Sequence, residues 1–356
     1  MKIGIITFHR AHNYGALLQA YAMQTFLNEN GHEAYMVDYR NKVLEEQYKL
    51  FSYRFYLGVG IKAPAHLVNR ILTFFLRIER RRNYKQFMES FLNLKDDANF
   101  DALIFGSDQI WNPSVTGGFD ENYWGNIYPK SKSLRIAYAP SIEAGVLDIY
   151  ADNVRNALKR FDAISVREVD MINNIKKYTD KKISLVCDPT FLIKKESYER
   201  LLKPIKVKGE FVAIYQVNKN SLTYQVAKHL AKRDGLKIVE LGQNTSFLHL
   251  CRYKNTAGPS EFLWIIKNAK YVVTSSFHGT ALSIIMQKQF FVTTMGKGEK
   301  RMKNLLEIAG LNDRLITNVI SSDTLLPIDY NKPLGSLDKY IRSSQEFIKK
   351  SLQKNV

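Results

Sequence analysis

The sequence predicts an α/β protein built from two Rossmann-like domains that face a cleft. Three observations predict this class. Short apolar runs alternate with helical segments along most of the chain. The alternation stops at a lysine-rich connection and then restarts. The length of 356 residues also exceeds what one hydrophobic core usually serves.

The first domain begins with a short apolar run, Ile3 to Thr7, which predicts a strand. A polar loop follows, and residues 16–28 carry helical periodicity that Gly31 ends. Further apolar runs predict the remaining strands of a mostly parallel, doubly wound sheet: Ala34 to Asp38, Ala102 to Phe105, Ile136 to Ala139, Ala163 to Val166 and Ser184 to Val186.

A helical insertion, about residues 62–94, separates the second strand from the third. Its apolar run, Ile71 to Leu76, lies beside Arg77, Arg80, Arg81 and Arg82. The run is too short to span a bilayer. We favour a helix that packs on the domain with a solvated basic face, and contact with a membrane surface remains the alternative.

The second domain starts after Asp188-Pro189-Thr190, where the alternation resumes. A helix is expected near residues 224–232, and strands are expected at Phe211 to Gln216, Lys237 to Leu241, Tyr271 to Thr274 and Phe290 to Thr293. We therefore expect domains at 1–189 and 190–325 and a helical tail at 326–356. The amphipathic segment Leu337 to Leu352 in that tail is expected to cross back onto the first domain.

The composition limits the functions that the chain can have. Lysine and arginine number 52 against 34 acidic residues, and this net charge of +18 favours anionic ligands, nucleic acid or an acidic membrane surface. No helix-turn-helix, zinc-finger or RNP pattern occurs, so we do not expect nucleic acid as a partner. Cys187 and Cys251 lack metal-ligand spacing, so we expect buried thiols and no metal site. The apolar run near Met1 ends at polar His9 and is too short for a signal segment. We therefore expect a cytoplasmic protein, and peripheral contact at the inner face of the membrane stays open.

The most informative segment is Tyr271 to Ser283. An apolar strand ends in Ser275 and Ser276, His278 follows, and Gly279-Thr280 is expected to open a helix. Backbone N–H groups at such a helix start bind phosphate or carboxylate. We therefore predict an anion site at these residues, with His278 as the catalytic acid/base, because an imidazole titrates near neutral pH.

A second polar loop follows the strand Ala102 to Phe105. It delivers Asp108, Gln109, Trp111 and Asn112, whose flat aromatic face and polar groups suit a sugar ring. The alternative is a turn in which Asp108 caps backbone amides and Trp111 packs into the core.

The loop after the first strand runs from His9 to Ala16. It leads into a helix whose N-terminus is expected at the cleft, and we expect Asn13, Tyr14 and Gly15 to bind the acceptor there. Asn13 and Gly15 can equally serve as cap and turn. The G-x-G-x-x-G spacing is absent, so a dinucleotide is not supported.

Two arginines are expected at cleft-side strand ends. Arg167 follows the strand Ala163 to Val166, and Arg301 begins a helix after the loop that contains Lys297. A planar guanidinium can bind phosphate or carboxylate in a bidentate manner. We predict that both contact an anionic donor.

The sequence resembles the polysaccharide pyruvyltransferase family from the first strand to about Leu311. The resemblance rests on five ordered motifs: Asn13 to Ala22, Gly106 to Asn112, Ser165 to Glu168, Asp188 to Leu192 and Ser276 to Thr280. The resemblance implies the glycosyltransferase-B arrangement, phosphoenolpyruvate as donor and no cofactor. It places the family's histidine on His278 and one anion-binding arginine on Arg167.

The resemblance implies transfer of a pyruvyl group from phosphoenolpyruvate to sugar hydroxyls, which forms a pyruvate ketal during synthesis of capsule or other exopolysaccharide. The acceptor would be a glycan or a lipid-linked oligosaccharide. Many family members have an arginine beside the histidine, where this chain has Ser276-Phe277, and Arg301 or Lys297 is the expected replacement.

Two other functions remain open. One is a nucleotide-sugar glycosyltransferase on the same architecture, because a fold does not fix the chemistry. It is disfavoured because the loop from Gly242 to Gly258 has no acidic residue to hold a ribose. The other is a non-catalytic subunit that binds glycan or membrane.

Overall fold

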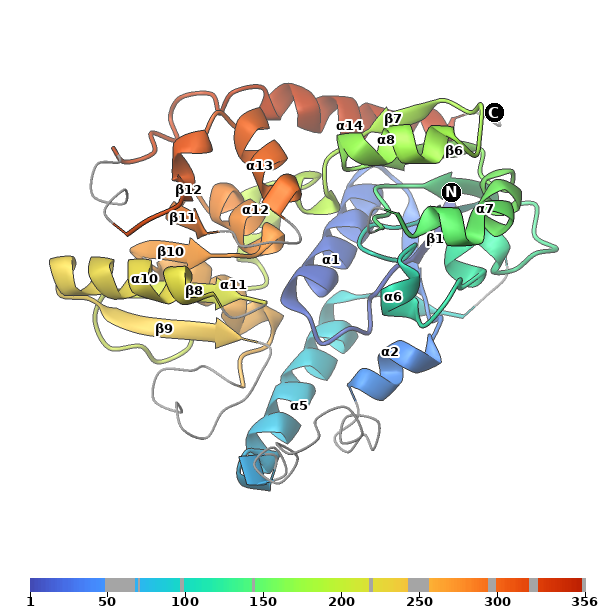
Figure 1. Ribbon diagram of the computed structural model, residues 1–356. Helices are drawn as coiled ribbons and strands as arrows, with labels where there is room; N and C mark the ends of the chain where they lie inside the picture. The colour runs from blue at the N-terminus through green and yellow to red at the C-terminus, as the bar shows by residue number, and fades with distance from the viewer. Residues whose placement is uncertain are drawn as a thin grey trace. The chain divides into compact units, whose positions relative to one another are not determined.

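The structure is a computed structural model that describes residues 1–48, 68–69, 71–96, 99–142, 145–217, 220–242, 256–293, 299–319 and 326–353. The chain divides into two compact units (Figure 1). Unit 1 comprises Met1–Lys49, Met88–Ile193 and Lys339–Val356. Unit 2 comprises Leu50–Phe87 and Lys194–Asp338.

In the described part of unit 1, the strands form a seven-stranded sheet in the order β3-β2-β1-β4-β5-β6-β7, and every pairing is parallel. This order is the Rossmann order, in which the chain first builds outward from β1 and then returns to β4. The strands are β1 (Lys2–Ile6), β2 (Glu33–Val37), β3 (Leu94–Lys95), β4 (Ala102–Phe105), β5 (Leu134–Ala137), β6 (Ala163–Val166) and β7 (Ile183–Leu185).

The core of unit 1 lies between the sheet and helices that flank it. β4 is buried along its whole length, as expected of a central strand in a parallel sheet. α1 (Tyr14–Glu29) is buried on nearly all sides because its sequence is apolar around most of its circumference. The other helical segments are α2 (Lys42–Gln47), α6 (Pro113–Thr116), a π-helical turn (Asn122–Asn126), two 3-10 turns (Leu147–Tyr150 and Pro189–Phe191), α7 (Ala151–Leu158) and α8 (Val169–Lys176).

Unit 2 contains a second parallel sheet. Its described strands have the order β12-β11-β10-β8-β9, which is the flavodoxin-like order 2-1-3-4-5 when the strands are counted within the unit. They are β8 (Phe211–Gln216), β9 (Lys237–Gly242), β10 (Tyr271–Thr274), β11 (Gln289–Thr293) and β12 (Leu315–Ile316).

Five helices and one 3-10 turn accompany these strands in the described part of unit 2. Asn220 caps α10 by accepting a hydrogen bond from the Leu222 amide, and Gly235 ends that helix in the left-handed region. Val212, Ile214 and Val273 of the sheet form a core with one face of α10. The helical segments are α9 (Lys195–Glu199), α10 (Ser221–Asp234), α11 (Pro259–Asn268), α12 (Phe277–Ile285), α13 (Glu299–Ile308) and a 3-10 turn (Asn312–Arg314).

Two helices contain residues of both units, α5 (Phe74–Phe91) and α14 (Leu337–Leu352). The first part of α5 is held in unit 2, because Arg80 Nη1 donates to Gly242 O and Asn83 Nδ2 donates to Thr256 O. The sequence places this segment as an insertion in the first domain, whereas the structure groups residues up to Phe87 with unit 2. The sequence could not show this grouping, because the hydrogen-bond partners of Arg80 and Asn83 lie more than a hundred residues further along the chain.

The C-terminal helix α14 packs on unit 1, as the sequence predicts. Ser344 Oγ accepts a hydrogen bond from Cys187 N at 2.8 Å, and Gln345 Nε2 donates to Leu192 O at 2.9 Å. These contacts join the last helix of the chain to residues just beyond β7 (Figure 1).

The predicted α/β class with two parallel sheets is confirmed. β4, β6, β8, β10 and α14 have the predicted bounds. The two-residue edge strands β3 and β12 were not predicted, because two residues are too short to show a periodic pattern. Among the described residues, no helix has both the length and the apolar character needed to cross a bilayer.

Candidate functional site

Each sheet has a topological switch point, where the segments that follow two neighbouring strands lead away in opposite directions. In unit 1 this point lies between β1 and β4, and in unit 2 it lies between β8 and β10. Ligands of open α/β sheets bind at the carboxyl ends of the strands at such points. The predicted loops after β1, β4 and β10 all begin at these two positions, which makes them the candidate sites.

In unit 2, the segment after β10 turns at once into α12. Ser276 is the N-cap residue, and its Oγ accepts a hydrogen bond from Gly279 N at 3.4 Å. Ser276 N donates to Thr274 Oγ1, and that hydroxyl donates to Tyr215 O. The helix therefore begins at Phe277, two residues earlier than the sequence predicts, because Ser276 and not Gly279 ends the extended segment.

Gly279 is required by close packing. A Cβ atom built on it would lie 2.2 Å from Thr274 Oγ1 and 2.9 Å from Tyr215 Cδ1. Any side chain here would push α12 away from the ends of β8 and β10. The glycine thus sets how closely the helix start approaches the sheet.

His278 lies in the first turn of α12. The residue is half-buried, and its ring meets the Phe277 ring edge-on with centroids 5.4 Å apart. No acidic residue occurs in this first turn, so the positive end of the helix dipole is not offset locally. The segment therefore brings an imidazole together with a helix start, as the sequence predicts.

The other residues of unit 2 that were predicted to bind the donor substrate differ from His278 in burial and position. Ser275 is half-buried and its amide donates to Tyr215 O at 3.3 Å. Thr280 does not reach a ligand site: it is fully buried, and its hydroxyl donates to Ser276 O, which is four residues back on its own helix. Arg301 lies half-buried in the first turn of α13, and Lys297 lies outside the described residues.

In unit 1, Asn13 caps α1. Its Oδ1 accepts hydrogen bonds from Gly15 N at 2.9 Å and Ala16 N at 3.3 Å, which confirms the cap alternative. Tyr14 and Gly15 were also predicted to bind the acceptor, but both are buried. Arg10, His12 and Asn13 stay partly exposed in this loop, at a helix start whose first turn has no acidic residue.

The loop after β4 is locked to the loop after β5. Asp108 has a φ of 73°, a left-handed conformation that few residues other than glycine adopt without cost. Its carbonyl accepts a hydrogen bond from Ser141 N at 2.8 Å, and its Oδ1 accepts one from Gln109 N at 2.9 Å. Asp108 and Gln109 are both partly exposed at the carboxyl edge, as the sequence predicts.

Trp111 and Asn112 do not face a ligand site. Trp111 is 0% exposed, it stacks on Trp124 with centroids 4.2 Å apart, and its Nε1 donates to Tyr123 O. Asn112 is equally buried, and its Oδ1 accepts from Ser114 N as the cap of α6. The prediction of an acceptor platform at these residues is wrong, since an aromatic cluster of the core already covers the indole ring.

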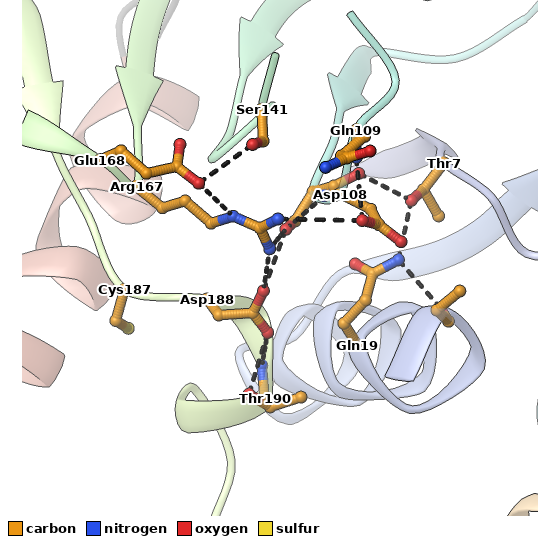
Figure 2. Close-up of polar contacts among 12 residues, drawn as sticks. Thr7, Gln19, Asp108, Gln109, Ser141, Arg167, Glu168, Cys187, Asp188 and Thr190 are labelled. Atoms are coloured by element: carbon orange, nitrogen blue, oxygen red, sulfur yellow. Dashed lines mark hydrogen bonds and ion pairs between the residues drawn. The ribbon is translucent and has the colours of Figure 1, made fainter. Parts of the chain in front are cut away.

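Arg167 directly follows β6 but does not project into solvent. Figure 2 shows its guanidinium among the carboxyl groups of Asp108, Glu168 and Asp188. Nη1 lies 2.6 Å from Asp188 Oδ2, Nε lies 3.1 Å from Glu168 Oε1, and Nη2 lies 3.8 Å from Asp108 Oδ1. Only 3% of the side chain is exposed.

The electrostatics of this cluster follow from its burial. Burial by itself lowers the pKa of Arg167, but the carboxyl groups of Glu168, Asp188 and Asp108 outweigh it and hold the pKa above its ordinary value. The guanidinium thus stays charged, and its charge is already engaged in ion pairs. Contact with an anionic donor would require Arg167 to exchange one of these partners, so its predicted role depends on a rearrangement.

Several residues of this cluster were not predicted as functional. Ser107 Oγ bridges Arg167 and Asp188 at 3.3 and 3.2 Å, and Thr190 donates twice to Asp188 Oδ1. The signal in the sequence is the position of Glu168 and Asp188 just after β6 and β7. It is ambiguous, because an acidic residue there can also cap the following turn, as Asp188 does for Pro189–Phe191.

Gln19 joins α1 to the same edge of the sheet. Its Nε2 donates to Thr7 Oγ1 at 2.8 Å, and Thr7 Oγ1 donates in turn to Ser107 O. Gln19 and Thr7 are both buried. They therefore tie the loop after β1 to the loop after β4 at the switch point of unit 1.

A large hollow of about 1210 Å³ lies elsewhere in unit 1. Met1, Asp101 and Leu134 line it, and these residues mark the amino ends of β1, β4 and β5. Doubly wound sheets bind ligands at the opposite ends of their strands. The hollow is therefore not the candidate site, despite its size.

A comparison with protein families finds that the model described as polysaccharide pyruvyl transferase matches residues 13–295, which is most of the chain. A comparison with curated proteins finds no match. Among solved structures, UDP-GlcNAc 2-epimerase from Neisseria meningitidis is similar, with a TM-score of 0.53, 12% identity and coverage of 100% of both chains. UDP-GlcNAc 2-epimerase from Methanocaldococcus jannaschii has a TM-score of 0.51 and 10% identity over 98% of this chain and 100% of that chain. At these identities the similarity shows the fold alone, which is the glycosyltransferase-B fold.

Proposed function

Because this chain belongs to the polysaccharide pyruvyl transferase family, we propose that it transfers the pyruvyl group of phosphoenolpyruvate to two hydroxyls of a sugar and forms a pyruvate ketal. The acceptor is a glycan or a lipid-linked oligosaccharide. The observation that carries the proposal is the placement of His278. Within the region matched by the family model, the imidazole lies at the start of α12, at the switch point of the unit 2 sheet.

The start of α12 has the properties that a dianionic donor requires. Its first turn has no acidic residue, and the helix dipole favours a phosphate or carboxylate there. The half-buried position of His278 limits the access of water, which strengthens electrostatic contacts. Arg301 is the proposed cationic partner, because it lies in the first turn of α13 in the same unit.

The proposed reaction has two steps. Protonation of the methylene carbon of phosphoenolpyruvate makes C2 electrophilic, and a sugar hydroxyl attacks C2 while it loses its proton. Inorganic phosphate then leaves, and a second hydroxyl attacks the same carbon, which closes the ketal. The proton that this second hydroxyl loses ends on the released phosphate. One imidazole can donate the first proton as an acid and accept the proton of the first hydroxyl as a base.

Unit 1 is the proposed acceptor side. Asp108 and Gln109 remain partly exposed at the carboxyl edge of the sheet, next to the switch point. Carboxylate and amide groups of this kind bind the hydroxyls of a sugar. Arg167 is proposed to contact the donor after it exchanges one of its carboxylate partners.

Ligand-induced thermal stabilisation tests the choice of donor, because a ligand that binds the folded state raises the melting temperature. We expect phosphoenolpyruvate to stabilise the wild type, and we expect His278→Ala to reduce that stabilisation. Nucleotide sugars serve as the comparison. Stabilisation by a nucleotide sugar alone would favour a glycosyltransferase instead, and stabilisation by neither ligand would favour a non-catalytic subunit.

A further inference from the structure

The first part of α5 and the residues just before it carry a row of exposed apolar side chains. This apolar row consists of Val68, Ile71, Leu72, Phe75 and Ile78. Phe75 is 81% exposed and Ile71 is 62% exposed. Large apolar side chains that are gathered and exposed in this way mark an interaction surface, whereas single ones need no explanation.

The spacing of the apolar row places it on one face of a helix. Each of its members lies three or four residues from another member along the chain, and this spacing returns to the same side of a helix. The opposite face is already occupied, because Thr73, Arg80 and Tyr84 are buried. Arg80 also donates to Gly242 O, which fixes this face against unit 2. The apolar row therefore lies on the other side of this segment and is not part of the core. Figure 1 shows the position of α5 in the chain.

One acidic residue, Glu79, and then two basic residues follow the apolar row on the exposed side of α5. Arg82 and Lys85 follow Ile78 at helical spacing, and both are exposed. In the sequence, no aspartate or glutamate occurs from Lys49 to Ile78, and Glu79 is the only acidic residue between Val68 and Lys85. An apolar stripe bordered by basic side chains is the pattern of a helix that lies on an anionic bilayer surface.

We propose that the apolar row, with Arg82 and Lys85, docks this protein on the surface of an anionic lipid bilayer. The apolar side chains would enter the boundary between headgroups and acyl chains, and the basic side chains would contact lipid phosphates. The apolar row alone would suit a second copy of the chain. The charge of the chain disfavours that occupant, because two copies of a protein with a net charge of +18 repel each other, whereas an anionic surface attracts it.

This docking goes beyond the proposed reaction and does not depend on it. It uses no residue of the candidate site, because His278, Asp108 and Arg167 lie on other elements. Loss of vesicle binding and loss of phosphoenolpyruvate binding can therefore be observed separately.

Vesicle flotation with the full-length protein tests the proposal. We expect the wild type to float with vesicles that contain phosphatidylglycerol, to float less with pure phosphatidylcholine, and to be released by high salt. The variant Ile71→Ser/Phe75→Ser should lower the partition coefficient by about tenfold or more, because each substitution removes apolar surface from the bilayer. The variant Arg82→Glu/Lys85→Glu should abolish the preference for the anionic vesicles.

Matched controls distinguish binding through this surface from nonspecific binding through other exposed apolar or basic residues. Ile149→Ser removes another side chain that is 75% exposed. Lys176→Glu/Lys177→Glu makes the same change in net charge on two exposed residues, the last residue of α8 and its C-cap. Both controls should float like the wild type. All of these positions are exposed, so circular dichroism should show an unchanged fold.

Three results would overturn the proposal. The wild type could fail to float with anionic vesicles, the Ile71→Ser/Phe75→Ser variant could float as well as the wild type, or the controls could lose binding to the same extent. Sedimentation of the lipid-free protein adds a fourth. A dimer that dissociates on Ile71→Ser/Phe75→Ser would assign the apolar row to self-association.

Discussion

Arg167 Nη1 lies 2.6 Å from Asp188 Oδ2 inside unit 1, and this ion pair joins the ends of β6 and β7. The same guanidinium also faces Glu168 and Asp108, so a single cation holds the polar loops together at the carboxyl edge of the sheet. Both partners of the pair are almost fully buried. Arg167 therefore has a structural role in unit 1, and any contact with the donor would come in addition to it.

Removal of the cation should destabilise unit 1 more than removal of one acid. We expect Arg167→Ala to cost about 3–5 kcal/mol, since it leaves buried carboxyl groups without a counter-charge. Arg167→Ala/Asp188→Ala should cost less than the sum of the two single variants, because each change relieves the other. Urea unfolding of a Trp264→Phe background measures this directly, since the remaining tryptophans, Trp111 and Trp124, both lie in unit 1. Additive losses would contradict the coupling.

The close approach of α12 to the sheet predicts a strong effect at Gly279. Gly279→Ala should destabilise unit 2 by about 1–3 kcal/mol and should speed amide hydrogen exchange at the start of α12, because the added methyl overlaps Thr274 Oγ1. Thr274→Ala/Gly279→Ala should recover part of the protection that Gly279→Ala alone loses, because it removes the hydroxyl that the added methyl overlaps. Unchanged exchange in Gly279→Ala would show that the helix start can move without cost.

Asp38 predicts how the stability of unit 1 responds to acid. Burial raises the pKa of this carboxyl, but hydrogen bonds from His9, Arg10 and Arg40 outweigh it and hold the pKa well below its ordinary value. A depressed pKa contributes stability that is fully present above the unfolded-state value, near about pH 4, and is lost as the pH falls below it.

The test compares the wild type with Asp38→Asn. Between about pH 5 and pH 3, the wild type should lose more of its stability than the variant, because only the wild type must protonate this carboxyl. Urea unfolding at each pH, in the Trp264→Phe background, supplies the comparison. Parallel losses in the two proteins would mean that Asp38 does not contribute to the acid response.

The strands of both sheets could be predicted from the sequence because parallel strands buried on two faces give short continuous apolar runs. β8, Phe211–Gln216, is buried at every position and has the predicted bounds. The element bounds near the site were less predictable. α12 begins two residues earlier than expected, since a serine hydroxyl can cap a helix or bind a ligand and the sequence alone does not distinguish these uses.

The candidate site was only partly predictable for the same reason. His278 lies at a strand end and helix start, as position in the chain indicates. The sequence allows Trp111 either to bind a sugar or to pack in the core, and only the structure reveals its partner Trp124 in the aromatic cluster. Arg167 shows the general limit: a sequence places an arginine at an edge, but its partners, Asp188 above all, come from a different strand.

A comparison of pyruvyl transfer by the wild type and by His278→Ala tests whether the His278 imidazole catalyses this reaction. The measurement follows phosphate release from carbon-labelled phosphoenolpyruvate together with the appearance of label in a glycan acceptor fraction. His229→Ala, which changes another histidine of unit 2, is the control. We expect the wild type and His229→Ala to form a labelled ketal and His278→Ala to lower turnover by about 10²-fold or more. Near-normal turnover by His278→Ala, or no label transfer by the wild type to any acceptor, would contradict this proposal.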